Sequence, residues 1–326
     1  DSERENHPED SGGPHHAIWD ALDHAATDEA SAHIGWKSQA TERWHYRLHA
    51  NWNSIESEEQ TPGIFPGFAV PPRGADVNFD RYQLAWVNQL QFHRIRLGLG
   101  IDAQREDGDS RGYIDFGFPL DTGFSLIRDS TSGFAEAYIE VIEPLALSAS
   151  VRYDDVERSG SELTSRFGLL WRPTGRTTVR ANWGEGFKPP SFFALAHPLV
   201  GNPELDPERT ERWEVGIEQH LNDSWSIDLV YFDATYKDLI DFDDQLFTNV
   251  NRDRVDARGV EFSARAGTGA LGDLRLHATW TETDIANLKQ TLRGRPEWKW
   301  GIQWFYDANP NLGLTAEYLW VDEVTE

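Results

Sequence analysis

Three carboxylates lie close together at Asp241, Asp243 and Asp244, in a segment that we expect to connect two strands. Hard cations such as Ca²⁺ take several oxygen ligands, so this spacing suits a calcium site that orders a loop. The competing interpretation is an acidic loop exposed to solvent. The same two interpretations apply to a second acidic group, and a histidine group near the N-terminus has the chemistry to bind a transition metal. These groups are Asp20, Asp23, Asp28 and Glu29, and His15, His16 and His24.

Catalytic constellations are absent from the sequence. The 326 residues contain no Gly-x-Ser-x-Gly elbow, no His-Glu-x-x-His pair and no phosphate-binding glycine-rich loop. There is no Cys, which excludes disulfides, thiolate metal sites and cysteine nucleophiles. We therefore expect no enzyme activity and no resident cofactor besides calcium. The 55 acidic residues against 30 basic ones give a net charge of −25, which argues against nucleic acid as a partner.

Apolar and polar residues alternate along most of the chain. Leu147 and Val151, for example, alternate with Ser148 and Arg152. Such a period of two places one face of a strand in an apolar medium and the other in a polar one. The pattern predicts fourteen strands, at 31–38, 43–56, 77–90, 95–107, 128–142, 145–157, 161–174, 177–189, 209–220, 225–240, 252–266, 273–285, 293–307 and 312–325.

The connections between these strands favour a membrane barrel. Short polar turns alternate with longer connections, of which the main ones are 57–76, 108–127, 190–208 and 241–251. This plan is typical of antiparallel outer-membrane β-barrels, whose strands are also longer than those of soluble sheets. The alternative is a soluble β-sandwich or propeller with a tryptophan-rich core.

The side chains on the two faces decide between these alternatives. Tryptophans gather at the ends of the apolar faces, as in the girdles of membrane barrels. They are Trp44, Trp52, Trp171, Trp183, Trp225, Trp280, Trp298 and Trp320. The other face carries many cations, which a wet lumen accommodates and a packed core does not. They are Arg47, Arg81, Arg96, Arg152, Arg166, Arg180, Arg265, Arg275, His49 and His277. We expect an all-β, antiparallel transmembrane barrel.

A motif in the middle of the chain resembles the signature of TonB-dependent outer-membrane receptors. It consists of Phe187-Lys188-Pro189-Pro190 at a strand end and Asn202-Pro203-Glu204-Leu205-Asp206-Pro207-Glu208 before the next strand. A second resemblance lies at Ala257-Arg258-Gly259-Val260-Glu261. The similarity is specific over 160–326, and over 31–160 it rests on the strand pattern.

The resemblance implies a function in transport. Members take up scarce ligands across the outer membrane of Gram-negative bacteria, driven through TonB, which acts on a plug domain inside a 22-stranded barrel. It also implies outer-membrane lipid as surroundings and a small-molecule ligand: a ferric siderophore, cobalamin or haem. Haem receptors place a ligand histidine between the two segments of the motif, where His197 stands. We expect Phe192 and Phe193, at the mouth of the lumen, to contact the ligand. A passive porin-like channel remains the functional alternative.

The same resemblance predicts the organisation of the chain. Nothing in the sequence is similar to a plug, and about 14 of a likely 22 strands are present. The simplest interpretation is a central barrel fragment, in which residues 1–30 are an acidic extracellular loop and residues 31–326 are part of the barrel. Residues 1–30 contain nine acidic side chains and one basic one. A complete barrel of fourteen strands is the competing interpretation.

Overall fold

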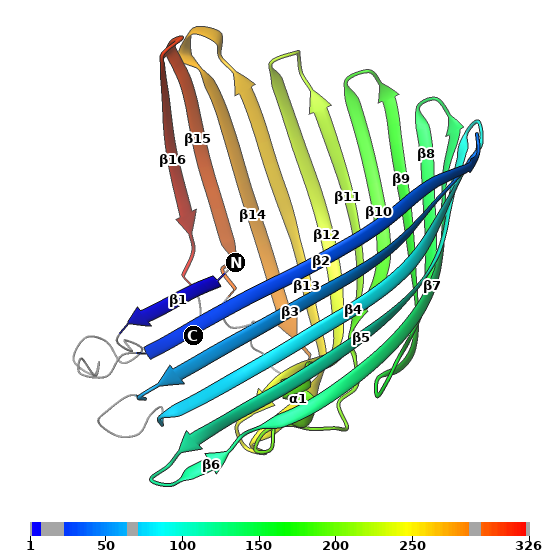
Figure 1. Ribbon diagram of the computed structural model, residues 1–326. Helices are drawn as coiled ribbons and strands as arrows, with labels where there is room; N and C mark the ends of the chain where they lie inside the picture. The colour runs from blue at the N-terminus through cyan, green and yellow to red at the C-terminus, as the bar shows by residue number, and fades with distance from the viewer. Residues whose placement is uncertain (1, 8–22, 64–70, 287–294, 324–326) are drawn as a thin grey trace.

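The chain forms a single curved antiparallel sheet (Figure 1). The computed structural model describes residues 2–7, 23–63, 71–286 and 295–323. The strands and helices are β1 (Ser2–His7), β2 (Asp23–Thr41), β3 (Trp44–Thr61), β4 (Arg73–Gln91), β5 (Ile95–Asp115), β6 (Pro119–Asp121), β7 (Phe124–Ile142), β8 (Leu145–Val156), β9 (Gly160–Thr174), β10 (Thr177–Lys188), α1 (Phe192–Ala196), β11 (Glu208–His220), β12 (Trp225–Asp243), β13 (Thr248–Gly267), the 3₁₀ turn η1 (Gly269–Leu271), β14 (Asp273–Ile285), β15 (Trp298–Asn309) and β16 (Leu312–Val321).

Each strand pairs with its neighbours in chain order, as in a meander. The order runs from β1 to β16, with the short strand β6 paired to β5 beside this path. No pairing joins β1 to β16 among the described residues, so the sheet that they form is open. In that same part of the chain, no helix has the length and apolarity that a membrane crossing requires.

All fourteen predicted strands are present, as β2 to β5 and β7 to β16. The connections were predicted less well, because much of 57–76, 108–127 and 241–251 is strand. For example, β12 and β13 remain paired up to Asp243 and Thr248. Backbone hydrogen bonds between strands do not need alternating apolar side chains, so a hairpin continues where the sequence period has faded. The periodicity therefore marks the apolar band of each strand and misses the polar extensions.

The same reason corrects the expectation for residues 1–30. Ser2–His7 and the start of β2 at Asp23 are strands rather than loop, and they pair with each other from Ser2↔Asp28 to His7↔Asp23. Residues 8–22, which belong to the same predicted loop, lie outside the described residues.

The two faces of the sheet differ in chemistry. Helix α1 lies on the concave side (Figure 1), and Phe192 in α1 packs against Phe79 and over Gly108. Residues that are paired across strands share a face, so Phe79 and Gly108 define the concave face of every strand through the register. Exposed leucines, isoleucines and tryptophans, such as Leu84, Leu229 and Trp300, occupy the convex face.

Tryptophan side chains at the ends of the convex face combine an apolar ring with a satisfied indole N–H. Toward the longer connections, Trp52, Trp183 and Trp280 donate to Asp80, Glu211 and Glu297 at 3.0 Å each. Toward the short turns, Trp44 donates to Asn88 at 3.1 Å and Trp304 to the carbonyl of Leu271 at 2.7 Å. Rings that are apolar on one side and polar on the other match the two interfaces of a bilayer.

Candidate functional site

An aromatic recess of about 630 Å³ lies on the concave face, at the end away from the short turns. Phe192, Phe193 and His197, the three predicted ligand contacts, all line it. The residues that complete the recess belong to β3, β4, β5, β7 and the connections between strands, and five of them are aromatic. These five are Phe79, Tyr113, Phe116, Phe124 and Phe247. We call this site the aromatic recess.

The ring contacts show how the predicted residues divide their roles. Phe193 and His197 have centroids 4.6 Å apart, and Phe124 lies 6.4 Å from Phe193 and 6.3 Å from His197. Phe193 is 50% exposed, whereas Phe192 is 9% exposed and packs on Phe79 with centroids 5.9 Å apart. A Cβ on Gly108 would come within 2.5 Å of the Phe192 ring, so only glycine leaves room for it. Phe193 is thus available to a ligand, and Phe192 anchors the helix.

Helix α1 is fixed to the wall by polar contacts as well. Ser191 caps it, because its hydroxyl accepts a hydrogen bond from the Ala194 N–H at 3.1 Å. Pro190 is fully buried, and its carbonyl accepts from Arg128 Nη1 at 2.8 Å. The Arg128 guanidinium also lies 4.8 Å from the centre of the Phe192 ring. Arg128 therefore holds both the backbone before the helix and its first side chain.

Arg128 belongs to a charged triplet across three strands. Glu106 faces Arg81 on β4 and Arg128 on β7 directly in the register. Its two carboxylate oxygens pair with Arg81 Nη2 at 2.8 Å and Arg128 Nη2 at 2.6 Å. The Glu106 side chain is 6% exposed and that of Arg128 13%. A carboxylate so buried is stable only when it is paired, so each member of the triplet depends on the others.

The second half of the motif closes the same loop. Asn202 accepts from the Glu204 N–H at 2.9 Å and donates to the Asn249 carbonyl at 3.0 Å. Leu205 is buried against Ala194 and Leu195 of α1. Beyond it, Glu208 accepts from the Ile240 N–H at 2.9 Å and pairs with Lys188 Nζ at 3.1 Å. The motif residues thus connect β10, α1, β11 and the β12–β13 hairpin into one unit.

His197 lies in this unit in a form that does not suit metal ligation. Its Nδ1 accepts a hydrogen bond from the Leu199 N–H at 3.3 Å. Because the site is partly desolvated, burial lowers the pKa of His197 and favours the neutral ring. In a neutral ring whose Nδ1 accepts, the proton is on Nε2, which is then a donor rather than a ligand. The arrangement favours stacking or hydrogen bonding over coordination of haem iron.

The carboxylates considered for calcium are engaged differently. Arg252 pairs with Asp241 at 3.2 Å and with Asp243 at 3.3 Å. The N–H groups of Leu246 and Gln245 donate to Asp243, each at 2.9 Å, and these backbone hydrogen bonds lower its pKa. Within the described ranges, no group of three or more acidic or histidine side chains is placed to hold a metal ion. Asp241 and Asp243 thus order a turn together with Arg252, and the arrangement with Asp244 lends no support to calcium.

The other groups singled out near the N-terminus lie mostly outside the described residues. Asp20, His15 and His16 are among those that are not described, whereas Asp23, His24, Asp28 and Glu29 lie in β2.

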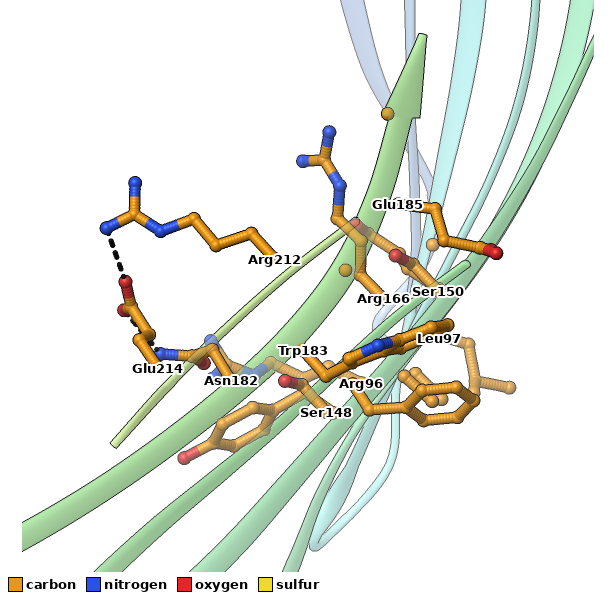
Figure 2. Close-up of a pocket in the computed structure, with 18 of the residues that line it drawn as sticks. Arg96, Leu97, Ser148, Ser150, Arg166, Asn182, Trp183, Glu185, Arg212 and Glu214 are labelled. Atoms are coloured by element: carbon orange, nitrogen blue, oxygen red, sulfur yellow. Dashed lines mark hydrogen bonds and ion pairs between the residues drawn. The ribbon is translucent and has the colours of Figure 1, made fainter. Parts of the chain in front are cut away.

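A second, polar recess of about 690 Å³ lies further along the concave face (Figure 2). Arg96, Ser148, Ser150, Arg166, Asn182, Arg212 and Glu214 line it. Glu214 links Arg212 at 3.1 Å with Asn182 at 3.0 Å, the two dashed contacts of Figure 2. The Arg96 guanidinium lies over the Tyr138 ring at 4.2 Å. We call this site the polar recess.

The concave face carries the predicted arginines, and several of them are paired with carboxylates of the same wall. Arg152 pairs with Asp102 and Asp154, and Arg180 pairs with Asp228 at 2.7 Å. These cations, with Arg81, are therefore neutralised by the wall itself. Arg47, Arg96, Arg166, Arg265 and Arg275 make no ion pair with any residue that the structure describes. Arg96 and Arg275 lie over the rings of Tyr138 and Phe305, so Arg47, Arg166 and Arg265 are the most available to another surface.

A curved antiparallel sheet with an apolar convex face and a polar concave face is the wall of a transmembrane β-barrel. A family model described as TonB dependent receptor-like, beta-barrel, matches residues 5–325. The chain belongs to this family, as the sequence motif predicted.

Three relatives show the range of the similarity. Over 208 residues the chain is 28% identical to the vitamin B12 transporter BtuB of Vibrio vulnificus (strain YJ016), and the match covers 62% of this chain and 32% of the relative. The copper transporter OprC superposes with a TM-score of 0.77 at 13% identity, over 92% of this chain and 55% of that one. The ferric-catecholate import receptor Fiu of E. coli K12 superposes with a TM-score of 0.72 at 14% identity, over 92% of this chain and 54% of that one. The chain thus spans about a third of the curated relative and about half of these structures.

Several residues of the site were not singled out from the sequence. Phe79, Phe124, Glu106 and Arg128 were missed, although all of them occupy the polar, concave phase of their strands. The signal that would have found the triplet is the register, because Arg81, Glu106 and Arg128 stand directly opposite one another. Periodicity gives the face of each residue but not its partner on the next strand.

Proposed function

We propose that the protein is an outer-membrane receptor of a Gram-negative bacterium, which captures a scarce small ligand and imports it in a TonB-dependent step. The observation that supports this best is the aromatic recess, built by the family motif at the end of the wall away from the short turns. In barrels of this kind the short turns face the periplasm, so the recess would face the exterior.

The lining of the recess bears on the class of ligand. Phenyl rings and His197 provide rigid apolar area, and the charged pair Glu59–Arg73, 3.5 Å apart, lies at its exposed margin. A ligand with a flat or apolar, weakly charged surface fits such a lining. Cobalamin has such a surface, whereas a ferric tris-catecholate carries several negative charges, and the similarity to a vitamin B12 transporter also favours cobalamin. Haem remains the alternative, bound by stacking rather than through His197.

The concave wall supplies the second part of the proposal. The polar recess and the unpaired Arg47, Arg166 and Arg265 would meet the carboxylates and carbonyls of a plug domain, through which TonB would act. Arginine suits that role because its planar donors bind carboxylates in pairs. The convex face would contact outer-membrane lipid. Binding and passage of a ligand need no bond making or breaking, so the proposal includes no enzyme activity.

Uptake by cells tests the proposal. The full-length protein is expressed in a Gram-negative strain that lacks its own receptors, and accumulation of radiolabelled cyanocobalamin, a ferric catecholate and haem is measured. We expect one of the three to accumulate when TonB is present and none when TonB is deleted. Uptake that does not depend on TonB, together with steady ion conductance in planar bilayers, would instead identify a passive channel.

A further inference from the structure

Two histidines face each other across β2 and β3, and neither of them lines the aromatic recess or the polar recess. The register pairs His33 with Asn51 and Gly35 with His49, so the two imidazoles are diagonal neighbours on the concave face. Their ring centroids lie 6.2 Å apart and their planes are inclined by 40°. Adjacent imidazoles on neighbouring strands are a geometry in which one ion can be held by two ligands.

The distance is compatible with a shared ion. Metal–nitrogen bonds are about 2.0–2.1 Å and a ring nitrogen lies about 1 Å from the ring centre, so two imidazoles on one ion have centres up to about 6 Å apart. The observed 6.2 Å is at the upper end of this range, and a small rotation of either side chain shortens it.

Gly35 shows where the free nitrogen of His33 points. A Cβ placed on Gly35 would lie 3.1 Å from His33 Nε2, which means that the ring leans along its own strand over Gly35. Gly35 is the direct partner of His49. His33 Nε2 is therefore directed toward the position that His49 occupies, and the glycine leaves space between the two rings.

Polar neighbours set the tautomer of His33. Its Nδ1 is hydrogen-bonded to the Asn51 side-chain oxygen, which can only accept, so Nδ1 carries the proton. Asn51 is oriented in turn by its Nδ2, which donates to Gln83 Oε1 at 3.0 Å. The lone pair of a neutral His33 is then on Nε2, the nitrogen directed toward His49. A second hydrogen bond that fixes ring and tautomer in this way is typical of metal-binding histidines.

His49 supplies an independent observation. Its Nδ1 is buried from solvent and has no hydrogen-bond partner among the described residues. Unsatisfied buried nitrogens are uncommon in folded proteins, and a bound ion or water frequently satisfies them. His49 is the one imidazole with such an atom in the part of the chain that the structure describes. The ring nitrogen of His49 thus has the capacity to bind an ion beside His33.

We propose that His33 and His49 form a binding site for a transition-metal dication on the concave wall. Imidazole nitrogen suits Cu²⁺, Ni²⁺ and Zn²⁺, and Cu²⁺ binds most tightly in this series. Since no third histidine or carboxylate of the described residues joins the pair, water or a ligand of the metal completes the coordination. Lys37 and Arg47 are paired across the same two strands and lie on the concave face next to the histidines. Their positive charges repel a bare dication, so they favour a metal ion that carries an anionic ligand.

Copper binding to the purified full-length protein in detergent tests this site. Cu²⁺ is titrated into the protein, and electron paramagnetic resonance reports how many imidazole nitrogens coordinate it. We expect a two-nitrogen signal that is lost in His33→Ala and in His49→Ala, with affinity reduced by more than about tenfold in each. Loss of a residue that hydrogen-bonds a metal-binding histidine lowers the metal affinity by about 10–100-fold, so Asn51→Ala is expected to weaken binding as well.

Two further variants distinguish copper binding at this site from copper binding to other histidines. His45→Ala is the matched control, because His45 lies on the same strand and face but stands opposite Gln39. It is expected to leave the two-nitrogen signal unchanged. Gly35→Val keeps both imidazoles and fills the space between them, so it is expected to reduce binding. Wild-type affinity and spectrum in either histidine variant, or in Gly35→Val, would overturn the proposal.

Discussion

At the residue scale, Phe192 and Phe193 are adjacent in sequence but have different environments. Phe192 is enclosed by Phe79, Gly108 and Arg128, and Phe193 exposes half of its surface to the aromatic recess. A helix turns by about 100° per residue, so two neighbours on α1 cannot both face the wall. The difference allows packing and ligand contact to be separated by substitution.

Phe193→Ala is expected to weaken ligand binding with little effect on folding. The substitution removes an exposed ring, and losing a stacked aromatic contact costs about 0.5–1.5 kcal/mol beyond its buried area. Intrinsic tryptophan fluorescence, titrated with cyanocobalamin, ferric catecholate or haem, measures the affinity. Phe192→Ala serves as the packing control and is expected to lower the free energy of unfolding by about 3 kcal/mol. Equal destabilisation by the two variants would contradict this division of roles.

The protonation of His197 makes the stability of the loop depend on pH. Burial lowers its pKa in the folded protein below that of the unfolded chain. Between the two values the unfolded chain binds more protons, so stability is full above about pH 6.5 and decreases as the pH falls below it. Hydrogen exchange of residues 192–197, corrected for intrinsic rates, is expected to accelerate from pH 7.5 to pH 5. His197→Gln is expected to remove the acceleration, and exchange that is independent of pH in the wild type would refute the assignment.

At the scale of elements, α1 has five residues, too few to be stable as an isolated helix. Its position depends on Ser191, on the buried Pro190 and on the triplet of Arg81, Glu106 and Arg128. The triplet joins three adjacent strands, so it also fixes the wall on which the helix lies. We regard Glu106 as the central member, because both arginines pair with its carboxylate.

Glu106→Gln is expected to destabilise the protein by about 3 kcal/mol, since it leaves Arg128 buried without its charge partner. Arg81, whose side chain is 47% exposed, remains hydrated and contributes less to this cost. Equilibrium unfolding by urea in detergent measures the effect. The matched control is Asp129→Asn, which breaks the exposed Arg105–Asp129 pair at 3.2 Å and is expected to cost less than about 1 kcal/mol. Similar values for the two variants would show that the triplet has no special role.

The elements also show how far the sequence predicts the structure. All the strands with an alternating apolar pattern, such as Leu145–Val156, were predicted, because a strand that crosses a bilayer places an apolar side chain at every second position. The polar ends of β5 and β12 were not, since outside the apolar band both faces are wet. Phe192, Phe193 and His197 were found through the motif, whereas Glu106 and Arg128 depend on a register that one sequence does not reveal.

At the scale of the whole molecule, the sheet separates two environments over its entire described width. Arg180, Arg212 and Glu261 lie on the concave face, while Val179, Trp213 and Val260 beside them lie on the convex face. The large exposed hydrophobic side chains of the convex face would make a soluble sheet aggregate. The net charge of −25 is compatible with a membrane protein, because charged residues such as Arg180, Arg212 and Glu261 lie on the concave face.

Phe262 and Ser263 test this separation at neighbouring positions of β13. They lie between the levels of Trp280, which pairs with Val260, and Trp225, which pairs with Ala266. Phe262 faces outward and Ser263 inward, so Phe262→Arg places a charge near the bilayer midplane at a cost of about 2–4 kcal/mol. Ser263→Arg places the same charge in the wet lumen and is expected to be tolerated. The fraction folded into lipid vesicles, read as heat-modifiable gel mobility, is expected to fall for the first variant only. If both variants fold equally well, the convex face is not in contact with lipid.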